Sequence, residues 1–124
     1  MKSSINPRYA KNVVIHLSFN FSVSIVRYCI ELRNNKEFEL SNQLIKSGTS
    51  IGANLMEAQN AESSADFKHK IKIALKEADE TEYWIRILIE VFNEDNLHKL
   101  LQSVQEIIKI LNKILSTLSK KARN

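Results

Sequence analysis

The stretch SGTSIGANLMEAQNAES, residues 47–63, contains both glycines of the chain, four residues apart among serines, a threonine and alanines. A phosphate-binding loop would need Gly-x-x-x-x-Gly-Lys-Ser/Thr after a strand, because backbone amides then surround the phosphates and the lysine meets their charge. Here the glycines are one residue too close, no lysine follows and no strand precedes. Nucleotide binding by this stretch is therefore disfavoured.

Helical spacing explains the same stretch better. An apolar face runs through it at three-and-four spacing, and its members are Leu44, Gly48, Ile51 and Leu55. Each glycine inside a helix costs about 1 kcal/mol relative to alanine. We therefore predict a helix over 39–60 in which Gly48 and Gly52 lie where another helix approaches closely.

Two long helices are predicted in the second half of the chain. Apolar residues follow an unbroken heptad series from Phe67 to Phe92, and three-and-four spacing from Leu97 to Leu118. These patterns predict helices over 64–92 and 97–121, antiparallel because the turn between them is short.

Local capping signals support these helices. Ser63 with Asp66 resembles a capping arrangement for the first of them, and Asp95 or Asn96 is the expected N-cap of the second.

The N-terminal third allows two interpretations. From Ile15 to Ile25 apolar and polar residues alternate, which is typical of a strand, but no other stretch offers a partner strand. As a helix over 8–33, the segment carries two apolar stripes, and the second predicts a subunit contact. The expected oligomer interface comprises this second stripe and part of the third helix: Ile15, Phe19, Val23, Val26, Ile30, Trp84 and Ile87.

Together these segments predict an all-α fold: one antiparallel up-down-up-down four-helix bundle over residues 1–124. One proline and two glycines leave little material for β-turns. The single Cys29 cannot form an internal disulfide, so we expect a cytoplasmic protein with a packed thiol. No run of about 18 apolar residues is present, so no membrane span is expected.

Metal and catalytic sites are not expected. Asp66-x-x-His69 and Asp95-x-x-His98 resemble half-sites of di-metal bundles, but each opens a different helix of an antiparallel pair, roughly 40 Å apart. Arg8 and His16 are too far apart in sequence for a helical ribonuclease of the HEPN type. We predict a protein that is not an enzyme, with no cofactor, no metal and no catalytic residues.

Polar residues of the second and third helices allow a binding or a structural interpretation. Asn54 and Glu57 follow the glycines at helical spacing. They are either a binding position or part of a buried hydrogen-bonding network reaching Glu82 or Tyr83, which would fix the helix register. The structural interpretation is favoured for Gly48, Gly52, Asn54, Glu57 and Glu82.

Basic residues are the remaining functional signal. The net charge is only +4, yet lysines repeat at four-residue spacing on the third and fourth helices. Such stripes are either a solvated surface or a phosphate-binding surface, and a ring-like oligomer would multiply their effect. The candidate nucleic-acid-binding residues are Lys68, Lys72, Lys76, Lys109, Lys113, Lys120, Lys121 and Arg123.

Residues 41–88 resemble the 23S rRNA intervening-sequence protein family. The motif residues that carry the resemblance are Gln43, Ser47, Ser50, Ile51, Asn54, Glu57, Ser64, Asp66, Phe67 and the run Glu80 to Trp84. Where many relatives have Asn-Ile-Ala-Glu-Gly, this chain has alanine at position 58, which suggests a longer second helix.

The resemblance implies an up-down-up-down bundle and a homo-oligomer, a pentameric ring. It also implies kinship with the accessory variability proteins of diversity-generating retroelements, which bind nucleic acid and a reverse transcriptase. The family name records a genomic location and does not establish rRNA binding. Our first hypothesis is a non-catalytic homo-oligomer that binds RNA or DNA through its lysine-rich outer faces. The second is a structural or protein-interaction module that binds a partner protein and no nucleic acid.

Overall fold

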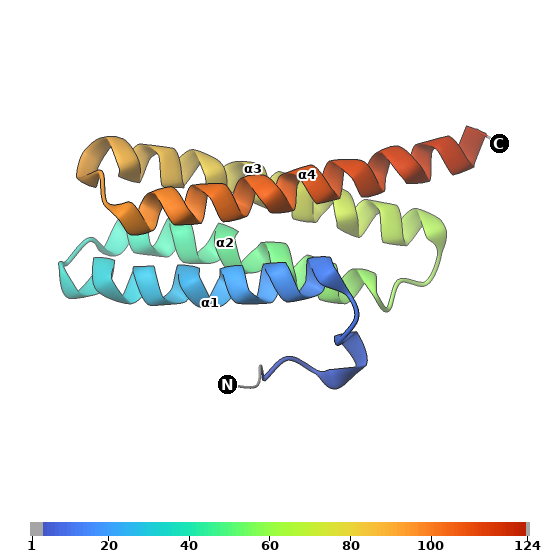
Figure 1. The fold of residues 1–124 in the computed structure, drawn as a ribbon, viewed down its shortest axis with the longest axis horizontal. Coiled ribbons are helices and arrows are strands. Elements are labelled where there is room, and N and C mark those ends of the chain that lie inside the picture. Colours follow the sequence, from blue (N-terminus) through green and yellow to red (C-terminus); the bar gives the residue numbers. More distant parts are fainter. Residues whose placement is uncertain (1–3, 124) are drawn as a thin grey trace.

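The computed structural model describes residues 4–123, which form a short 3-10 turn and four long helices. The elements are η1 (Pro7–Tyr9), α1 (Val13–Asn34), α2 (Phe38–Ala58), α3 (Ser64–Phe92) and α4 (Asp95–Arg123). Successive helices run in opposite directions and pack side by side, so the chain forms a four-helix bundle (Figure 1). The predicted all-α fold is confirmed, and the strand interpretation of Ile15 to Ile25 is wrong because that segment lies within α1.

The core lies along the bundle axis and receives one apolar stripe from each helix. On α3 the buried positions follow the predicted heptads: Ile71, Ala74, Ala78, Thr81, Ile85 and Leu88. On α4 the buried positions keep three-and-four spacing from Leu97 to Leu111. Tyr9 of the N-terminal segment joins this core, although it lies outside the four helices.

Both glycines of α2 face α1. A Cβ atom at Gly48 would lie 2.9 Å from Cγ2 of Ile25, so a side chain there would have to displace the buried Ile25 side chain. At Gly52 a Cβ atom would lie 3.4 Å from the hydroxyl oxygens of Ser18 and Ser22, which is ordinary contact distance. The expected close approach is therefore tightest at Gly48.

The predicted network joining Asn54, Glu57 and Glu82 does not form. The Asn54 amide donates to the Ser50 carbonyl oxygen of its own helix at 2.8 Å. Glu57 is exposed and pairs with Lys70 at 3.5 Å. Glu82 accepts from the Arg86 guanidinium group at 2.9 and 3.0 Å. The prediction was wrong because each side chain finds a nearer partner.

Capping groups set the helix ends. α1 begins at Val13, later than the expected residue 8, because the Asn12 side chain accepts from the Ile15 amide and starts the helix there. α3 begins after Ser63, whose hydroxyl accepts from the Asp66 amide at 3.0 Å, as predicted. α2 ends at Ala58, two residues before the predicted residue 60. α4 already starts at Asp95, one residue earlier than the predicted caps allow.

α1 is long and apolar enough to cross a membrane by length and composition alone. The expectation that the chain has no candidate membrane span therefore underestimated the mean hydropathy of α1. Its buried side chains, among them Phe21, Ile25 and Leu32, belong to the bundle core. A core helix of a soluble protein satisfies the same criterion.

Candidate nucleic-acid interface

Charge is divided between the two ends of the bundle. The antiparallel arrangement brings the start of α1, the end of α2, the start of α3 and the end of α4 to one end (Figure 1). Dividing each helix near its midpoint defines a basic half, residues 4–23, 49–78 and 109–123, and an acidic half, residues 24–48 and 79–108.

The basic half has ten basic side chains against four acidic ones, leaving out Arg123, whose side chain lies outside those that the structure describes. Its basic residues are Arg8, Lys11, Lys68, Lys70, Lys72, Lys76, Lys109, Lys113, Lys120 and Lys121, and its acidic residues are Glu57, Glu62, Asp66 and Glu77. The acidic half reverses this balance, with six basic and ten acidic side chains. A modest net charge therefore conceals a pronounced charge separation along the bundle.

All the described lysines that the sequence singled out for nucleic-acid contact belong to the basic half. Lys68 is half-buried, and the other six are exposed. Among the side chains that the structure describes, two basic residues form ion pairs: Lys70 with Glu57, and Arg86 with Glu82. The lysine charges of both stripes are therefore available to an external anion.

The N-terminal segment adds two basic residues that sequence reasoning did not include. An open groove of about 670 Å³ lies between this segment and α4, and its lining includes Arg8, Lys11, Gln59, Ile110 and Ile114. The Arg8 guanidinium carbon lies 5.2 Å from the centre of the adjacent tyrosine ring, which holds the side chain at the groove.

A sequence signal could have found Arg8 and Lys11. Pro7 opens the short 3-10 turn and Asn12 caps α1, so the residues between them are not the first turns of a long helix. The predicted helix over 8–33 placed both residues on α1 and hid their position beside α4.

The second stripe of α1 remains largely outside the core. Ile30 is 53% exposed and Val26 is 36% exposed, whereas Phe19 and Val23 are half-buried. Ile15 is 1% exposed, so its assignment to an oligomer interface was wrong. Ile15 lines an opening together with Ile5 and Asn6 of the N-terminal segment and Met56 of α2, so it faces these segments of the same chain.

The two interface candidates on α3 are half-buried. Trp84 packs against the core, and its indole nitrogen is buried without a hydrogen-bond acceptor in the described part of the chain. Ile87 lies one turn further along the same helix. Only part of each side chain is free to contact another molecule.

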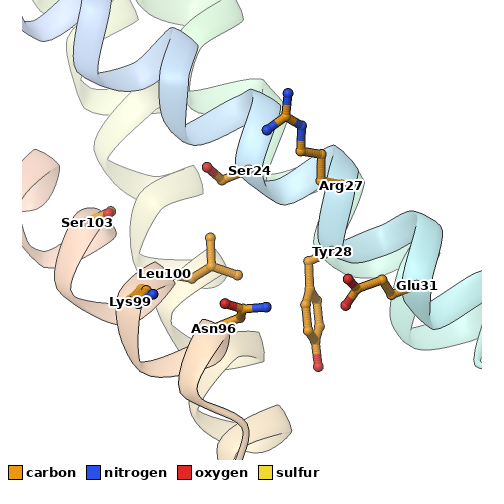
Figure 2. Close-up of a pocket in the computed structure, with 8 residues that line it drawn as sticks. All are labelled: Ser24, Arg27, Tyr28, Glu31, Asn96, Lys99, Leu100 and Ser103. Atoms are coloured by element: carbon orange, nitrogen blue, oxygen red, sulfur yellow. The ribbon is translucent and has the colours of Figure 1, made fainter.

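A second opening, of about 280 Å³, lies between α1 and α4 in the acidic half. Figure 2 shows Leu100 directed into the space between the helices, while the Arg27 guanidinium group points away from it. Glu31 and Lys99 add charges of opposite sign to the lining. The polar groups therefore do not converge on one ligand position.

The buried titratable groups serve the fold. Burial, and then the hydrogen bond that its hydroxyl donates to Glu94 at 3.0 Å, raises the pKa of Tyr28 far above its usual range. Burial also raises the pKa of the Cys29 thiol, which disfavours the nucleophilic thiolate.

The two histidines of the half-site patterns lie apart. His69 opens α3 and His98 opens α4, both exposed, and the His98 ring is 3.0 Å from the side-chain oxygen of Asn93. In residues 4–123 no group of three metal-ligating side chains comes together.

Comparisons with known proteins agree with this architecture. The sequence model of the family described as 23S rRNA-intervening sequence protein matches residues 10–113. A crystal structure from Bacteroides thetaiotaomicron VPI-5482, described as a protein with unknown function from the S23 ribosomal protein family, is 45% identical in sequence. It superposes with a TM-score of 0.80, and the match covers 82% of this chain and 97% of that one. No curated protein matches the sequence. Neither description names a catalytic activity.

Proposed function

From the premise that the chain belongs to the 23S rRNA-intervening sequence protein family, we propose that it is a non-catalytic, self-associating protein that binds RNA or DNA through its basic half. We place it in the cytoplasm, where both polymers are available. In this proposal self-association and nucleic-acid binding use different surfaces.

The charge separation carries the nucleic-acid part of the proposal. Phosphate contacts by lysine and arginine release counterions, and this release supplies most of the free energy of non-specific binding. The basic half offers unpaired lysines on the outer faces of α3 and α4, and the acidic half would repel the same polymer. A bound strand is therefore directed to one end of the bundle.

The exposed apolar side chains carry the self-association part. Within residues 4–123 all large exposed apolar residues except Val13 lie in the acidic half. Val26 and Ile30 of α1 are among them, and so is Phe38, which opens α2 and is 47% exposed. Exposed apolar side chains gathered in one half of a molecule are typical of subunit contacts. A pentamer assembled on this surface would present five basic ends to one polymer, which raises avidity without further contacts.

Fluorescence anisotropy with labelled RNA and DNA tests the binding. We expect association at about 50 mM salt and a loss of at least tenfold in affinity by about 200 mM, because several phosphate contacts are made. The variant Lys109→Gln with Lys113→Gln should bind at least fivefold more weakly. The control Lys36→Gln with Lys99→Gln removes the same charge from the acidic half and should bind like the wild type. Binding that ignores salt, or equal losses in both variants, would refute the role of the basic half.

Light scattering tests self-association. Val26→Asp with Ile30→Asp places charges on the exposed stripe and should yield monomers, whereas the wild type should have the mass of a pentamer. A monomeric wild type at micromolar concentration would contradict this part alone.

A wild-type protein that retains no nucleic acid but co-purifies with a defined partner protein would favour a structural or protein-interaction module instead. The exposed apolar stripe of α1 is the feature that such a partner would cover.

A further inference from the structure

The exposed Phe and Tyr side chains lie away from the basic surface. Within the described chain the exposed Phe, Tyr and Trp rings are Phe38, Tyr83 and Phe92, and all three belong to the acidic half. In the basic half Tyr9 is buried, whereas Phe19 and Phe67 are half-buried. Among the described residues the positive surface therefore has no exposed Phe, Tyr or Trp ring, and its exposed ring is the small imidazole of His69.

Proteins that hold single strands stack bases on exposed rings, and each stacked base contributes roughly 1–3 kcal/mol. A double helix keeps its bases stacked internally and is held without such rings, by phosphate contacts alone. It also presents a phosphate charge about every 1.7 Å along its axis, which is denser than a single strand. A basic surface without exposed Phe, Tyr or Trp rings therefore favours a duplex.

The groove between the N-terminal segment and α4 supplies a position for the backbone. Arg8 and Lys11 line one side of it, and Ile110 and Ile114 of α4 line the other. Lys121 lies two helical turns beyond Ile114, on the same face of α4. The groove thus has an apolar floor between cationic groups from two segments.

The outer face of α4 continues this basic surface. Lys113 and Lys120 are seven residues apart, so they share one face of the helix, and both are exposed. The last turns of α4 project beyond the start of α1 (Figure 1), so this face is open along its length.

We infer that this groove holds one sugar–phosphate backbone of double-stranded nucleic acid, with Arg8 and Lys11 on its phosphates and the outer face of α4 on the neighbouring turn. The inference rests on the proposed function and names both the form of its ligand and the place where it binds. Because no base edge is read, the ligand is any duplex of sufficient length, RNA or DNA.

Anisotropy titrations of a labelled duplex of about 24 base pairs test this, with its isolated single strand as the competing ligand. Both RNA and DNA versions are titrated. We expect the wild type to bind the duplex at least tenfold more tightly than the single strand. Arg8→Gln with Lys11→Gln should weaken duplex binding at least tenfold and make the slope of log K against log salt less steep by about 1.8, because two phosphate contacts are lost. Lys36→Gln with Lys99→Gln serves as the matched control.

The outcomes separate the two claims. A wild type that binds neither ligand at low salt refutes the proposed function itself. Single-strand binding as tight as duplex binding overturns the duplex assignment and leaves the function standing. An Arg8→Gln/Lys11→Gln protein that binds like the control overturns the groove as the binding position. Circular dichroism melting verifies that each variant is folded.

Discussion

Around Gly48 the side of α1 that faces α2 is tightly packed, whereas in the same half of the bundle the side that faces α4 leaves an opening of about 280 Å³. Nearer the start of α1, beside Gly52, the interface with α2 also opens, to about 290 Å³. Small residues explain the first interface, because Gly48, Ser18 and Ser41 let the two backbones come together. At the second interface the large Tyr28 and Leu100 side chains lie between α1 and α4. The distance between two helices thus follows from the size of the residues that face each other.

The largest expected changes in the free energy of unfolding come from substitutions at the contact between Gly48 and Ile25. Ile25→Ala should lower the free energy of unfolding by about 2–5 kcal/mol through the cavity it leaves. Gly48→Ala should lower it by about 1–3 kcal/mol, because the new methyl group overlaps a buried side chain.

The double variant tests whether these losses share one contact. The new methyl group would occupy space that Ile25 vacates, so the double variant should lose less than the two single losses together. Urea unfolding followed by circular dichroism, at one fixed protein concentration, measures all three. Simple additivity would show that the interface is not tightly packed.

Tyr28→Phe tests the looser interface. Loss of the hydrogen bond to Glu94 should cost about 1 kcal/mol near pH 7. The pKa of Tyr28 is higher in the folded than in the unfolded chain, so its contribution is complete below about pH 10 and is lost progressively above it. The difference in unfolding free energy between wild type and Tyr28→Phe should therefore shrink as the pH rises from about 9.5 to 11.5. A constant difference over that range would contradict the raised pKa.

A matched pair of serine variants compares the two interfaces directly. Ser41 is buried and donates to the Cys29 carbonyl oxygen at 3.3 Å, whereas Ser103 is exposed at the opening beside α4. Ser41→Ala should be less stable than Ser103→Ala by about 1 kcal/mol in thermal or urea unfolding. Ser103→Ala should stay within about 0.5 kcal/mol of the wild type. Equal stabilities would remove the distinction between the two faces of α1.

Gly52→Ala should have the smallest effect and the opposite sign. Its methyl group would meet the Ser18 and Ser22 hydroxyl oxygens at 3.4 Å, an ordinary contact. Relief of the helix cost of glycine should then raise the free energy of unfolding by about 0.5–1 kcal/mol. A loss as large as that of Gly48→Ala would mean that α1 and α2 are equally close at both glycines.

The predicted helix ends are accurate where a local cap or turn is enough to determine them. The bounds of α3 follow from the Ser63 cap at one end and the short polar turn at the other. The start of α1 was missed although Pro7 and the Asn12 cap mark it locally, whereas the burial of Tyr9 by the 3-10 turn before the helix is a tertiary effect. Ile15 was misassigned for a similar reason, since the width of a buried face depends on how closely a neighbouring helix approaches.

The candidate site was predictable in part. Each lysine stripe is visible in the sequence, and the antiparallel order of four helices is enough to gather the stripes at one end. To predict that Arg8 and Lys11 lie beside α4, one needs the path of the N-terminal segment, which no periodic pattern in the sequence specifies. The Asn54 side chain bonds within its own helix, and Glu82 bonds mainly to Arg86 of its own helix, with a long 3.5 Å hydrogen bond from Gln105 of α4. Neither side chain reaches the partner that the sequence predicted.

The weak pairing of α1 with α4 also has a consequence for how the chain folds. Dense packing joins helices that follow one another directly in sequence, and the sparse interface is the one between the first helix and the last. Bundles dominated by such local contacts fold within microseconds to milliseconds. Joining α1 to α4 closes the longest loop for the smallest gain in contacts. We therefore expect α2 and α3 to form the folding nucleus and the closure of α1 onto α4 to be the last step.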